Sequence, residues 1–223
     1  MKGKIAEVFE SIQGEGLYLG ERQIFVRFFG CNLSCQFCDT KLNRFIEYEA
    51  EELFEKIKLY QKGFHSISFT GGEPLLQKDY LREVLKLTSS QGYKNYLETN
   101  GTLPAELSDV IGYLDIVAMD LKLPSSTGAG HFWDEHRRFL EIASSREVFL
   151  KLVICEATEE EDLRQGLRLI KEINQAAILV LQPNSLENDG RLIDKLRKFK
   201  DISRTENINC RIIPQMHKIA GIR

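Results

Sequence analysis

The sequence has little of several things that would point to particular classes of protein. It holds five cysteines, five prolines and one tryptophan among 223 residues, and it has no apolar run long enough to cross a membrane. No secretion signal is recognisable. The formal net charge is -3, with lysines and arginines scattered among acids, so no basic stripe marks a nucleic acid partner. These absences predict a cytoplasmic protein that binds neither membranes nor nucleic acid.

The few cysteines are unevenly distributed. Cys31, Cys35 and Cys38 stand in the stretch GCNLSCQFCDT, residues 30–40, and random placement of the cysteines would produce this spacing only about 0.003 times per chain. An odd count with three cysteines crowded together argues against a disulfide framework. The cluster therefore predicts reduced thiolates that bind metal, whereas Cys155 and Cys210 are predicted to be small buried side chains.

Three thiolates leave two kinds of metal site to consider. A structural zinc ion is normally closed by four ligands, and the sequence offers no second Cys-x2-Cys pair, so a lone histidine would have to complete it. A four-iron cluster also takes thiolate ligands, and three of them leave one iron open to bind another molecule. An open iron implies chemistry rather than electron storage. The histidines in question are His65, His131, His136 and His217.

The hydrophobic pattern alternates between the strand period and the helix period along most of the chain. After strand candidates at 4–10 and 23–30, amphipathic helices separate short strands rich in apolar residues. Parallel strands need such crossovers, so we expect a single α/β domain with a parallel sheet, either doubly wound or a partial barrel. Further strands are expected at 66–70, 95–99, 115–120, 147–154, 177–182 and 210–214, and helices at 50–61, 79–91, 131–144, 159–174 and 186–200.

Polar segments, several of them glycine-containing, follow several of the expected strands. In both architectures a ligand binds at the carboxyl ends of the strands, so these segments should meet on one rim. They are GCNLSCQFC (30–38), GGEP (71–74), NGT (100–102), LKLPSS (121–126) and QPN (182–184). The cysteine cluster is thus expected to lie beside the loops that hold its ligand.

The spacing Cys31-x3-Cys35-x2-Cys38, with the aromatic Phe37 before the last cysteine, resembles the signature of the radical S-adenosylmethionine (SAM) enzymes. TGGEP, residues 70–74, resembles the second motif of that superfamily. The resemblance implies a partial parallel β/α barrel, a 4Fe-4S cluster on the three cysteines, and SAM on the open iron. It also implies cofactor contacts from Phe37, Gly71, Gly72, Glu73, Lys122, Ser125 and Gln182.

A second set of motifs resembles one branch of that superfamily over nearly the whole chain. The motifs are SIQGEG (11–16), Arg27 in the second strand, CDT (38–40), ETNGT (98–102), DLKLPSS (120–126) and QMHK (215–218). This branch contracts 6-carboxy-5,6,7,8-tetrahydropterin to 7-carboxy-7-deazaguanine and releases ammonia, a carbon-nitrogen lyase reaction of queuosine biosynthesis that uses Mg2+. The resemblance implies Thr40 as the Mg2+ ligand and substrate contacts from Ile12, Gln13, Gly14, Glu15, Arg27, Thr70 and His217, with no residue assigned to catalysis itself.

Elementary chemistry is compatible with these roles. The guanidinium of Arg27 can fork onto a carboxylate, although an arginine in an apolar strand can equally pair with an acid for structural reasons. Gln13 and Glu15 can read the amide and amino edge of a pterin. Thr40 offers Mg2+ a hard hydroxyl oxygen.

The same resemblance implies a single domain spanning residues 1–223, in which residues 1–22 and 205–223 contribute to the substrate side. It further implies a homodimer that receives electrons from a flavodoxin-like or other one-electron donor. Two other functions stay open at this point. One is an activase that installs a glycyl radical on a partner protein, and the other is a non-catalytic zinc or iron-sulfur module.

Overall fold

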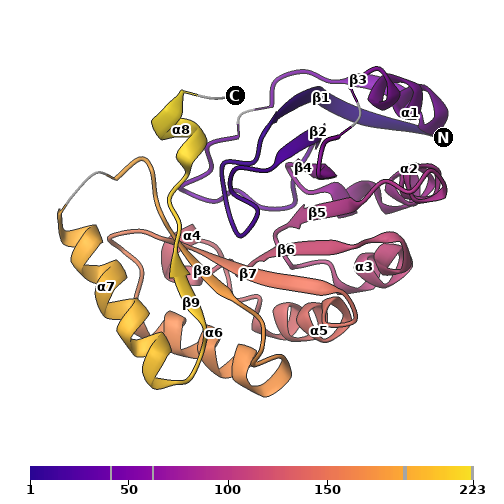
Figure 1. The fold of residues 1–223 in the computed structure, drawn as a ribbon. Coiled ribbons are helices and arrows are strands. Elements are labelled where there is room, and N and C mark those ends of the chain that lie inside the picture. Colours follow the sequence, from indigo (N-terminus) through magenta and orange to yellow (C-terminus); the bar gives the residue numbers. More distant parts are fainter. Residues whose placement is uncertain (41, 62, 188–189, 222–223) are drawn as a thin grey trace.

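The structure is a computed structural model that describes residues 1–40, 42–61, 63–187 and 190–221. Within these residues the strands form one nine-stranded sheet in the order β3-β1-β2-β4-β5-β6-β7-β8-β9 (Figure 1). The strands are β1 (Lys2–Ile12), β2 (Arg22–Phe28), β3 (Ile46–Glu49), β4 (Ser66–Gly71), β5 (Asn95–Thr99), β6 (Ile116–Asp120), β7 (Glu147–Ile154), β8 (Leu179–Pro183) and β9 (Cys210–Ile212).

Neighbouring strands from β2 to β9 pair in parallel, which confirms the predicted partial parallel β/α barrel. The sheet stays open, because β3 and β9 lie at its two edges. At the other edge β1 pairs in antiparallel fashion with both β2 and β3. A loop without a helix joins β1 to β2, and such a short return can only give antiparallel strands. Strand β3 was not among the expected strands.

Helices α1, α2, α3, α5, α6 and α7 cover the outer side of the curved sheet, whereas α8 lies beside the ends of the strands (Figure 1). Helix α1 begins with a capping box, in which the side chains of Glu49 and Glu52 accept from backbone N–H groups at its first turn. The helices are α1 (Ala50–Lys58), α2 (Lys78–Ser90), α3 (Pro104–Val110), α4 (Pro124–Thr127), α5 (Trp133–Ala143), α6 (Glu160–Ile173), α7 (Gly190–Thr205) and α8 (Met216–Ala220), with short 3-10 helices η1 (Pro74–Gln77) and η2 (Ile111–Tyr113).

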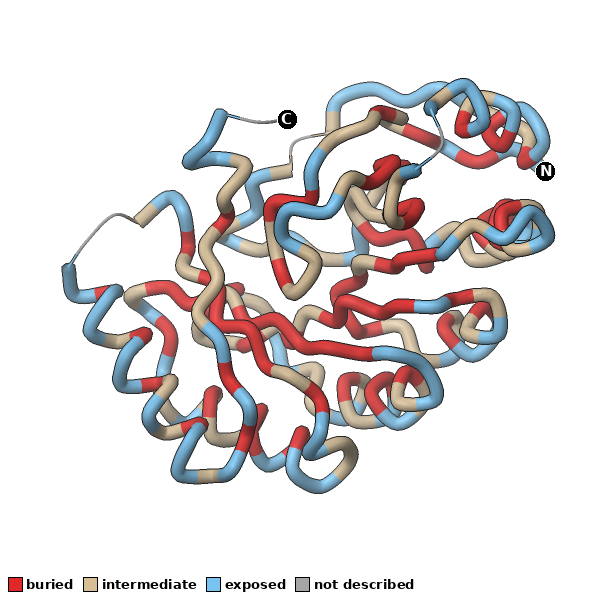
Figure 2. The backbone as a smooth tube through the Cα atoms, viewed as in Figure 1, coloured by how far each residue is buried: buried red, intermediate tan, exposed pale blue. Residues whose placement is uncertain are grey.

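Two hydrophobic clusters divide the buried side chains of the strands. On β6, Val117 and Met119 belong to the larger cluster, whereas Ile116 and Ala118 belong to the smaller one. The alternation arises because successive side chains of a strand point to opposite faces of the sheet. Figure 2 shows the central strands buried and much of the surface of the helices exposed. Tyr18, from the loop between β1 and β2, packs against the smaller cluster, so this loop lies on the inner face of the barrel.

Several boundaries differ from the expected ones. Helices α3, α4 and α8 were not predicted, because each is short and leaves little room for a helical period. Helix α7 is observed from Gly190, and residues 188–189 of the predicted helix at 186–200 lie outside the described residues, as do residues 222–223 of the C-terminal segment. Among the described residues, no helix has the length and apolar character needed to span a membrane.

Candidate active site

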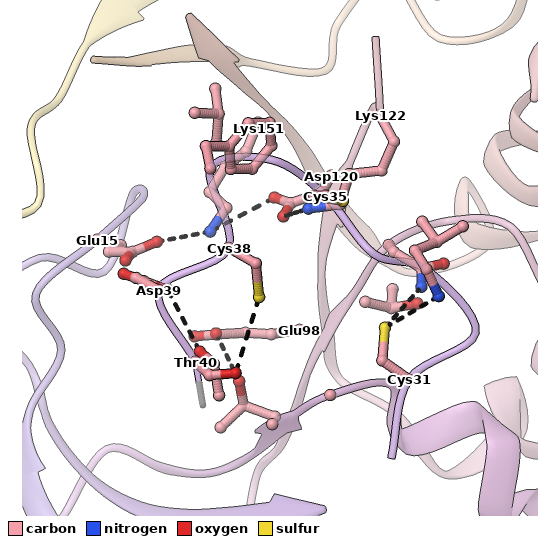
Figure 3. A pocket seen from close by; sticks show the side chains of 18 of the residues that line it. Glu15, Cys31, Cys35, Cys38, Asp39, Thr40, Glu98, Asp120, Lys122 and Lys151 are labelled. Carbon is pink, nitrogen blue, oxygen red and sulfur yellow. Dashed lines mark hydrogen bonds and ion pairs between the residues drawn. The ribbon is translucent and has the colours of Figure 1, made fainter. Parts of the chain in front are cut away.

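A cavity of about 410 Å³ opens at the carboxyl ends of the parallel strands (Figure 3). The polar segments that follow the strands meet on one rim there, as the sequence predicts, and strand β7 adds further residues. We call this space the cysteine cavity. Its lining includes Cys31, Cys35, Phe37, Cys38, Gly71, Gly72, Asn100, Asp120, Lys122, Lys151, Gln182 and Asn184.

The cysteine loop follows β2, and all three of its cysteines are free thiols that line the cavity. The backbone N–H of Gln36 holds this loop by donating a 3.0 Å hydrogen bond to the carbonyl oxygen of Thr127. Burial raises the pKa of the Cys31 thiol, and it likewise raises the pKa of the Cys35 thiol against the opposing charge of Lys122. A bound metal would therefore be needed to hold these two groups as thiolates at neutral pH.

The glycines of TGGEP bring the end of β4 against the cysteine loop. A Cβ on Gly72 would lie 1.9 Å from the carbonyl oxygen of Gly30. Gly71 has a φ of 121°, a backbone conformation that other residues rarely adopt. The backbone N–H of Glu73 donates to the same carbonyl of Gly30 at 2.8 Å. The two sequence motifs thus touch backbone to backbone, which only glycine permits.

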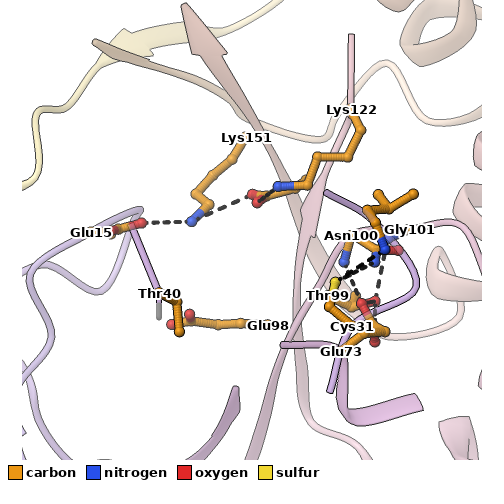
Figure 4. Close-up of polar contacts among 12 residues, drawn as sticks. Glu15, Cys31, Thr40, Glu73, Glu98, Thr99, Asn100, Gly101, Lys122 and Lys151 are labelled. Carbon is orange, nitrogen blue, oxygen red and sulfur yellow. Dashed lines mark hydrogen bonds and ion pairs between the residues drawn. The ribbon is translucent and has the colours of Figure 1, made fainter. Parts of the chain in front are cut away.

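Glu73 lies behind the wall of the cysteine cavity rather than on it. Its fully buried carboxylate accepts from the hydroxyl of Thr99 at 3.0 Å and from the backbone N–H groups of Leu75 at 3.1 Å and Asn100 at 2.7 Å (Figure 4). Burial raises the pKa of Glu73 to about 7, although these donors oppose the rise. The carboxylate therefore fastens the ETNGT loop to the TGGEP loop.

Lys122 is held in place by the cavity wall. Its Nζ lies 2.7 Å from Oδ2 of Asp120 and 5.4 Å from the ring centroid of Phe37. Burial by itself lowers the pKa of Lys122, but the charge of Asp120 outweighs it and leaves the pKa above its ordinary value. Lys122 is therefore a fixed cation of the site rather than a solvated loop charge.

Ser125, another predicted cofactor contact, is not brought to the cavity. Its hydroxyl donates to Asp162 at 2.5 Å and accepts from the backbone N–H of Glu159 at 3.0 Å. These partners lie at the beginning of α6, so the serine joins the loop after β6 to that helix.

A second cavity, of about 260 Å³, shares part of its lining with the first. We call it the distal cavity. The lining residues common to both cavities are Glu15, Asp39, Thr40, Thr70 and Glu98, so the two cavities are neighbours that share a wall. The distal cavity also brings together every residue predicted to contact substrate, namely Ile12, Gln13, Gly14, Glu15, Arg27, Thr70 and His217.

Arg27 lies on β2 directly opposite Glu7 of β1. Its Nε is 3.3 Å from Oε2 of Glu7, and its Cζ is 5.5 Å from the ring centroid of Phe9. Arg27 thus forms an ion pair with an acid, which was one of the two roles that the sequence left open for it. Since Arg27 also lines the distal cavity, the pairing orients the guanidinium while leaving it at the cavity wall.

The wall between the cavities is organised by Glu98 of β5. Its carboxylate accepts from the side-chain amide of Gln13 at 2.8 Å and from the hydroxyl of Thr70 at 2.9 Å. Thr40 stands on the same wall, with its hydroxyl 3.3 Å from Oδ1 of Asp39. Figure 3 shows Thr40 close to Glu98.

The C-terminal helix α8 packs on the distal cavity. The backbone N–H of Met216 donates to the carbonyl oxygen of Gly14 at 2.9 Å. A Cβ on Gly14 would lie 2.4 Å from Nδ1 of His217, so this glycine allows the two segments to approach. The ammonium of Lys218 lies 2.5 Å from Oδ2 of Asp39 on the cysteine loop.

Several residues of the site were not named from the sequence. Asp39, Glu98, Asp120 and Gln215 stand inside the quoted motifs CDT, ETNGT, DLKLPSS and QMHK, and their acidic or amide side chains were a usable signal. Lys151 gave a weaker signal, because it is a lysine among the apolar residues of a predicted strand.

The cysteine cavity fits a 4Fe-4S cluster with SAM. Oε1 of Gln182 is buried on its lining and has no hydrogen-bond partner among the described residues, and Oδ1 of Asp120, also buried there, has no partner among them other than the ammonium of Lys151 at 3.4 Å. The amino and hydroxyl groups of a nucleoside would satisfy such acceptors. Within the described part of the chain, no three His, Cys, Asp or Glu side chains converge on a point suited to one ion.

The class of protein follows from the fold, the cysteine cavity and the comparison with known families. Residues 25–163 match the Radical SAM superfamily. The fold is that of the crystal structure of QueE from Escherichia coli, at a TM-score of 0.68 and 21% identity, covering 95% of this chain and 94% of that chain. A domain of pyruvate-formate lyase-activating enzyme from Bacteroides vulgatus shares the fold less closely, at a TM-score of 0.54 and 17% identity over 66% of this chain and 98% of that chain. The site is thus that of a radical SAM enzyme.

Sequence similarity over the whole chain narrows the class. The chain is 35% identical to 7-carboxy-7-deazaguanine synthase of Geobacter sulfurreducens, a match that covers 98% of this chain and 97% of that protein. It therefore belongs to the 7-carboxy-7-deazaguanine synthases of the radical SAM superfamily. Membership of the superfamily implies a 4Fe-4S cluster and SAM as cofactors.

Proposed function

We propose that this enzyme is a lyase that converts 6-carboxy-5,6,7,8-tetrahydropterin to 7-carboxy-7-deazaguanine with release of ammonia, in queuosine biosynthesis. The observation that carries the proposal is the pair of neighbouring cavities with a shared wall, one lined by three thiols and the other by the predicted pterin contacts. The similarity to named synthases over nearly the whole chain supports the same reaction.

The cysteine cavity is proposed to hold the cofactors. When bound, the 4Fe-4S cluster on Cys31, Cys35 and Cys38 and its SAM supply the one-electron chemistry that starts hydrogen abstraction from the substrate. Gly71 and Gly72 would leave room for the methionyl end of SAM. Phe37 offers a flat face, Lys122 a donor and Gln182 an acceptor, while Glu73 and Ser125 would act by holding the loops that they hydrogen-bond.

The distal cavity is proposed to hold the pterin. Arg27 would pair with its carboxylate, because a guanidinium matches that group in shape and charge. Gln13 and Glu15 would read the amide and amino edge, with Ile12, Gly14, Thr70 and His217 completing the wall. Residues 1–22 and 205–223 would thus supply the substrate side of the single domain, a role supported by the lining that β1, the loop after it and α8 provide.

Thr40 is the proposed ligand of Mg2+. Its place on the wall common to both cavities supports this role, because its hydroxyl borders both the proposed cofactor site and the proposed substrate site. Mg2+ prefers hard oxygen ligands and keeps several waters, so one hydroxyl from the chain is compatible with binding.

A flavodoxin-like or other one-electron donor is the proposed redox partner. The exposed position of Cys38 supports it, since a donor protein could approach a cluster bound there. The homodimer and the cytoplasmic location remain predictions from the sequence.

Anaerobic turnover tests the proposed function. Reconstituted enzyme with a one-electron reductant, SAM, Mg2+ and 6-carboxy-5,6,7,8-tetrahydropterin should form 7-carboxy-7-deazaguanine and ammonia in equal amounts, measured by mass spectrometry and an ammonia assay. The Cys38→Ala variant is the control and should form neither. Steady cleavage of SAM with the pterin recovered unchanged would reject the assignment, and cleavage that needs a partner polypeptide would favour the activase.

A further inference from the structure

Lys151 is a buried lysine at the centre of the site. It lies on β7 with 6% of its surface exposed, and lysine is seldom buried unless it is paired. Its Nζ lies 2.7 Å from Oε2 of Glu15 and 3.4 Å from Oδ1 of Asp120 (Figure 3). The ammonium therefore joins an acid at the end of β6 to an acid of the loop after β1.

The two acids depend on Lys151 to different degrees. Asp120 has a second cation, because Nζ of Lys122 lies 2.7 Å from its other oxygen. Glu15 has no second permanent cation within ion-pair distance among the described residues. Its further partners are the neutral amide of Gln215 at 2.7 Å and Nδ1 of His217 at 3.9 Å. Removal of Lys151 would therefore leave Glu15 without a permanent cation among the residues that the structure describes, whereas Asp120 would keep Lys122.

Lys151 does not border the cavity in which Glu15 would bind the pterin. Glu15 lines both cavities, whereas Lys151 lines the cysteine cavity and is not part of the lining of the distal cavity. The lysine therefore reaches the carboxylate from the cofactor side, and a molecule in the distal cavity reaches it from the other side. One oxygen is engaged by Lys151 and the other by Gln215, which still leaves lone pairs free for ligand donors.

Because the ion pair is buried, the ionisation of Glu15 depends on the positive charge of Lys151. Burial alone raises the pKa of Glu15, but the charge and hydrogen bond of Lys151 outweigh it and leave the pKa below its ordinary value. Removing one partner of a buried ion pair leaves the other charge uncompensated, and that charge then protonates or turns toward water. Either outcome would remove an oriented carboxylate acceptor from the wall of the distal cavity.

We propose that Lys151 is a positioning residue for substrate recognition, which holds Glu15 ionised and oriented toward the donor edge of the pterin. The inference rests on the proposed function, because the edge that Glu15 would read, with its amino and amide N–H donors, belongs to the pterin. It assigns the lysine to recognition of substrate, although the side chain itself lies in the cavity of the cofactor.

The test is a double-mutant cycle on binding, with anaerobically reconstituted holoenzyme, SAM and no reductant. The variants are Lys151→Met, Glu15→Gln and the double variant, and the Kd of 6-carboxy-5,6,7,8-tetrahydropterin is measured by calorimetry. Each single variant should weaken pterin binding by about tenfold or more, and the double variant should bind no more weakly than Glu15→Gln. The Kd of SAM should stay within about twofold of the wild-type value.

Lys195→Met is the matched control. Lys195 is a partly buried lysine that donates to the backbone carbonyl of Thr158 at 2.9 Å and lines neither cavity. Its loss should lower the melting temperature and leave pterin binding unchanged. If Lys151→Met does not fold, Lys151→Gln keeps a donor without the charge and should show the same selective loss of pterin binding.

The outcomes separate this inference from the proposed function. Additive losses in the double variant, an equal loss of SAM affinity, or full pterin affinity in Lys151→Gln would overturn the role of Lys151 while leaving the proposed function intact. Wild-type enzyme that binds no pterin would reject the proposed function and, with it, this role.

Discussion

The side-chain amide of Gln215 donates a 2.7 Å hydrogen bond to Oε1 of Glu15, a residue 200 positions earlier in the chain. The same amide nitrogen lies 3.1 Å from Oδ2 of Asp39, which directly follows Cys38. One side chain near the C-terminal end therefore ties the loop after β1 to the cysteine loop. Two of the segments that form the wall between the cavities are thus held together by a residue from neither.

Replacing Gln215 should loosen this connection. Gln215→Met loses both donors, and hydrogen bonds to charged groups contribute about 1.5 to 3 kcal/mol each, so pterin affinity should fall about tenfold or more. Amide hydrogen exchange at residues 213–221 should become faster. Gln165→Met, on α6 and away from both cavities, serves as the control, and unchanged exchange in Gln215→Met would show that the connection is dispensable.

Gly72→Ala should prevent normal assembly of the cluster site. The added Cβ would meet the carbonyl oxygen of Gly30 at 1.9 Å and push the cysteine loop away from β4. We expect iron content after anaerobic reconstitution to fall to less than about half and stability to drop by about 3 kcal/mol. Gly112→Ala is the control, since nothing lies within 4 Å of its Cβ. Equal iron content in the two variants would contradict the role of this close approach.

Arg27 can be separated from its structural partner by paired substitutions. Arg27→Gln should lower kcat/KM for the pterin by at least about 30-fold, because a substrate carboxylate would lose its cation, while uncoupled SAM cleavage continues. Glu7→Gln breaks the ion pair between Glu7 and Arg27 without altering the lining of the distal cavity. It should lower kcat/KM for the pterin only a few-fold. Equal losses in both variants would mean that the arginine acts through structure alone.

Thr40 is best tested by titration of Mg2+. Thr40→Val removes the hydroxyl and keeps the shape, so the Mg2+ concentration for half-maximal turnover should rise about tenfold. Thr40→Ser keeps a hydroxyl and should remain close to the wild type. A Thr40→Val enzyme with an unchanged Mg2+ requirement would place the ion elsewhere.

His136 should make stability depend on pH. The ring is fully buried, with Nε2 3.2 Å from the carbonyl oxygen of Asn100, and burial lowers its pKa to about 4. The unfolded chain binds a proton near the ordinary pKa of about 6.5, so the stability that this neutral ring contributes is present above that pH and is lost as pH falls toward about 4. Wild-type protein should lose about 2 kcal/mol more than His136→Gln between about pH 7 and about pH 5, measured by urea unfolding.

Wild type must be compared with His136→Gln because Glu73 changes the stability with pH in the opposite direction. Burial raises the pKa of Glu73 to about 7, so its contribution becomes more favourable as pH falls through the same range. That contribution is common to both proteins and cancels in the difference. Parallel pH profiles for wild type and His136→Gln would show that the histidine is not the titrating group.

Strands and most helices were predictable because their signals are local. The period of apolar residues placed β5 and β7 at their observed bounds and placed α2 and α6 to within one residue at each end. The antiparallel edge was not predictable in the same way, because β3 is a short strand whose residues are half exposed and lack a buried face. The spacing of Cys31, Cys35 and Cys38 indicated a metal site for the same local reason.

The sequence by itself determined the alternation of strands and helices, the thiol cluster and the order of the motifs along one rim, since each depends on residues close together in the chain. Tertiary structure alone decided that Glu73 turns behind the wall, that Ser125 faces α6, and that Lys151 meets an acid 136 positions away. Such contacts arise only when the curved sheet brings β7, α8 and the loop after β1 together. Burial there sets the charge of each group, and no pattern along the chain records it.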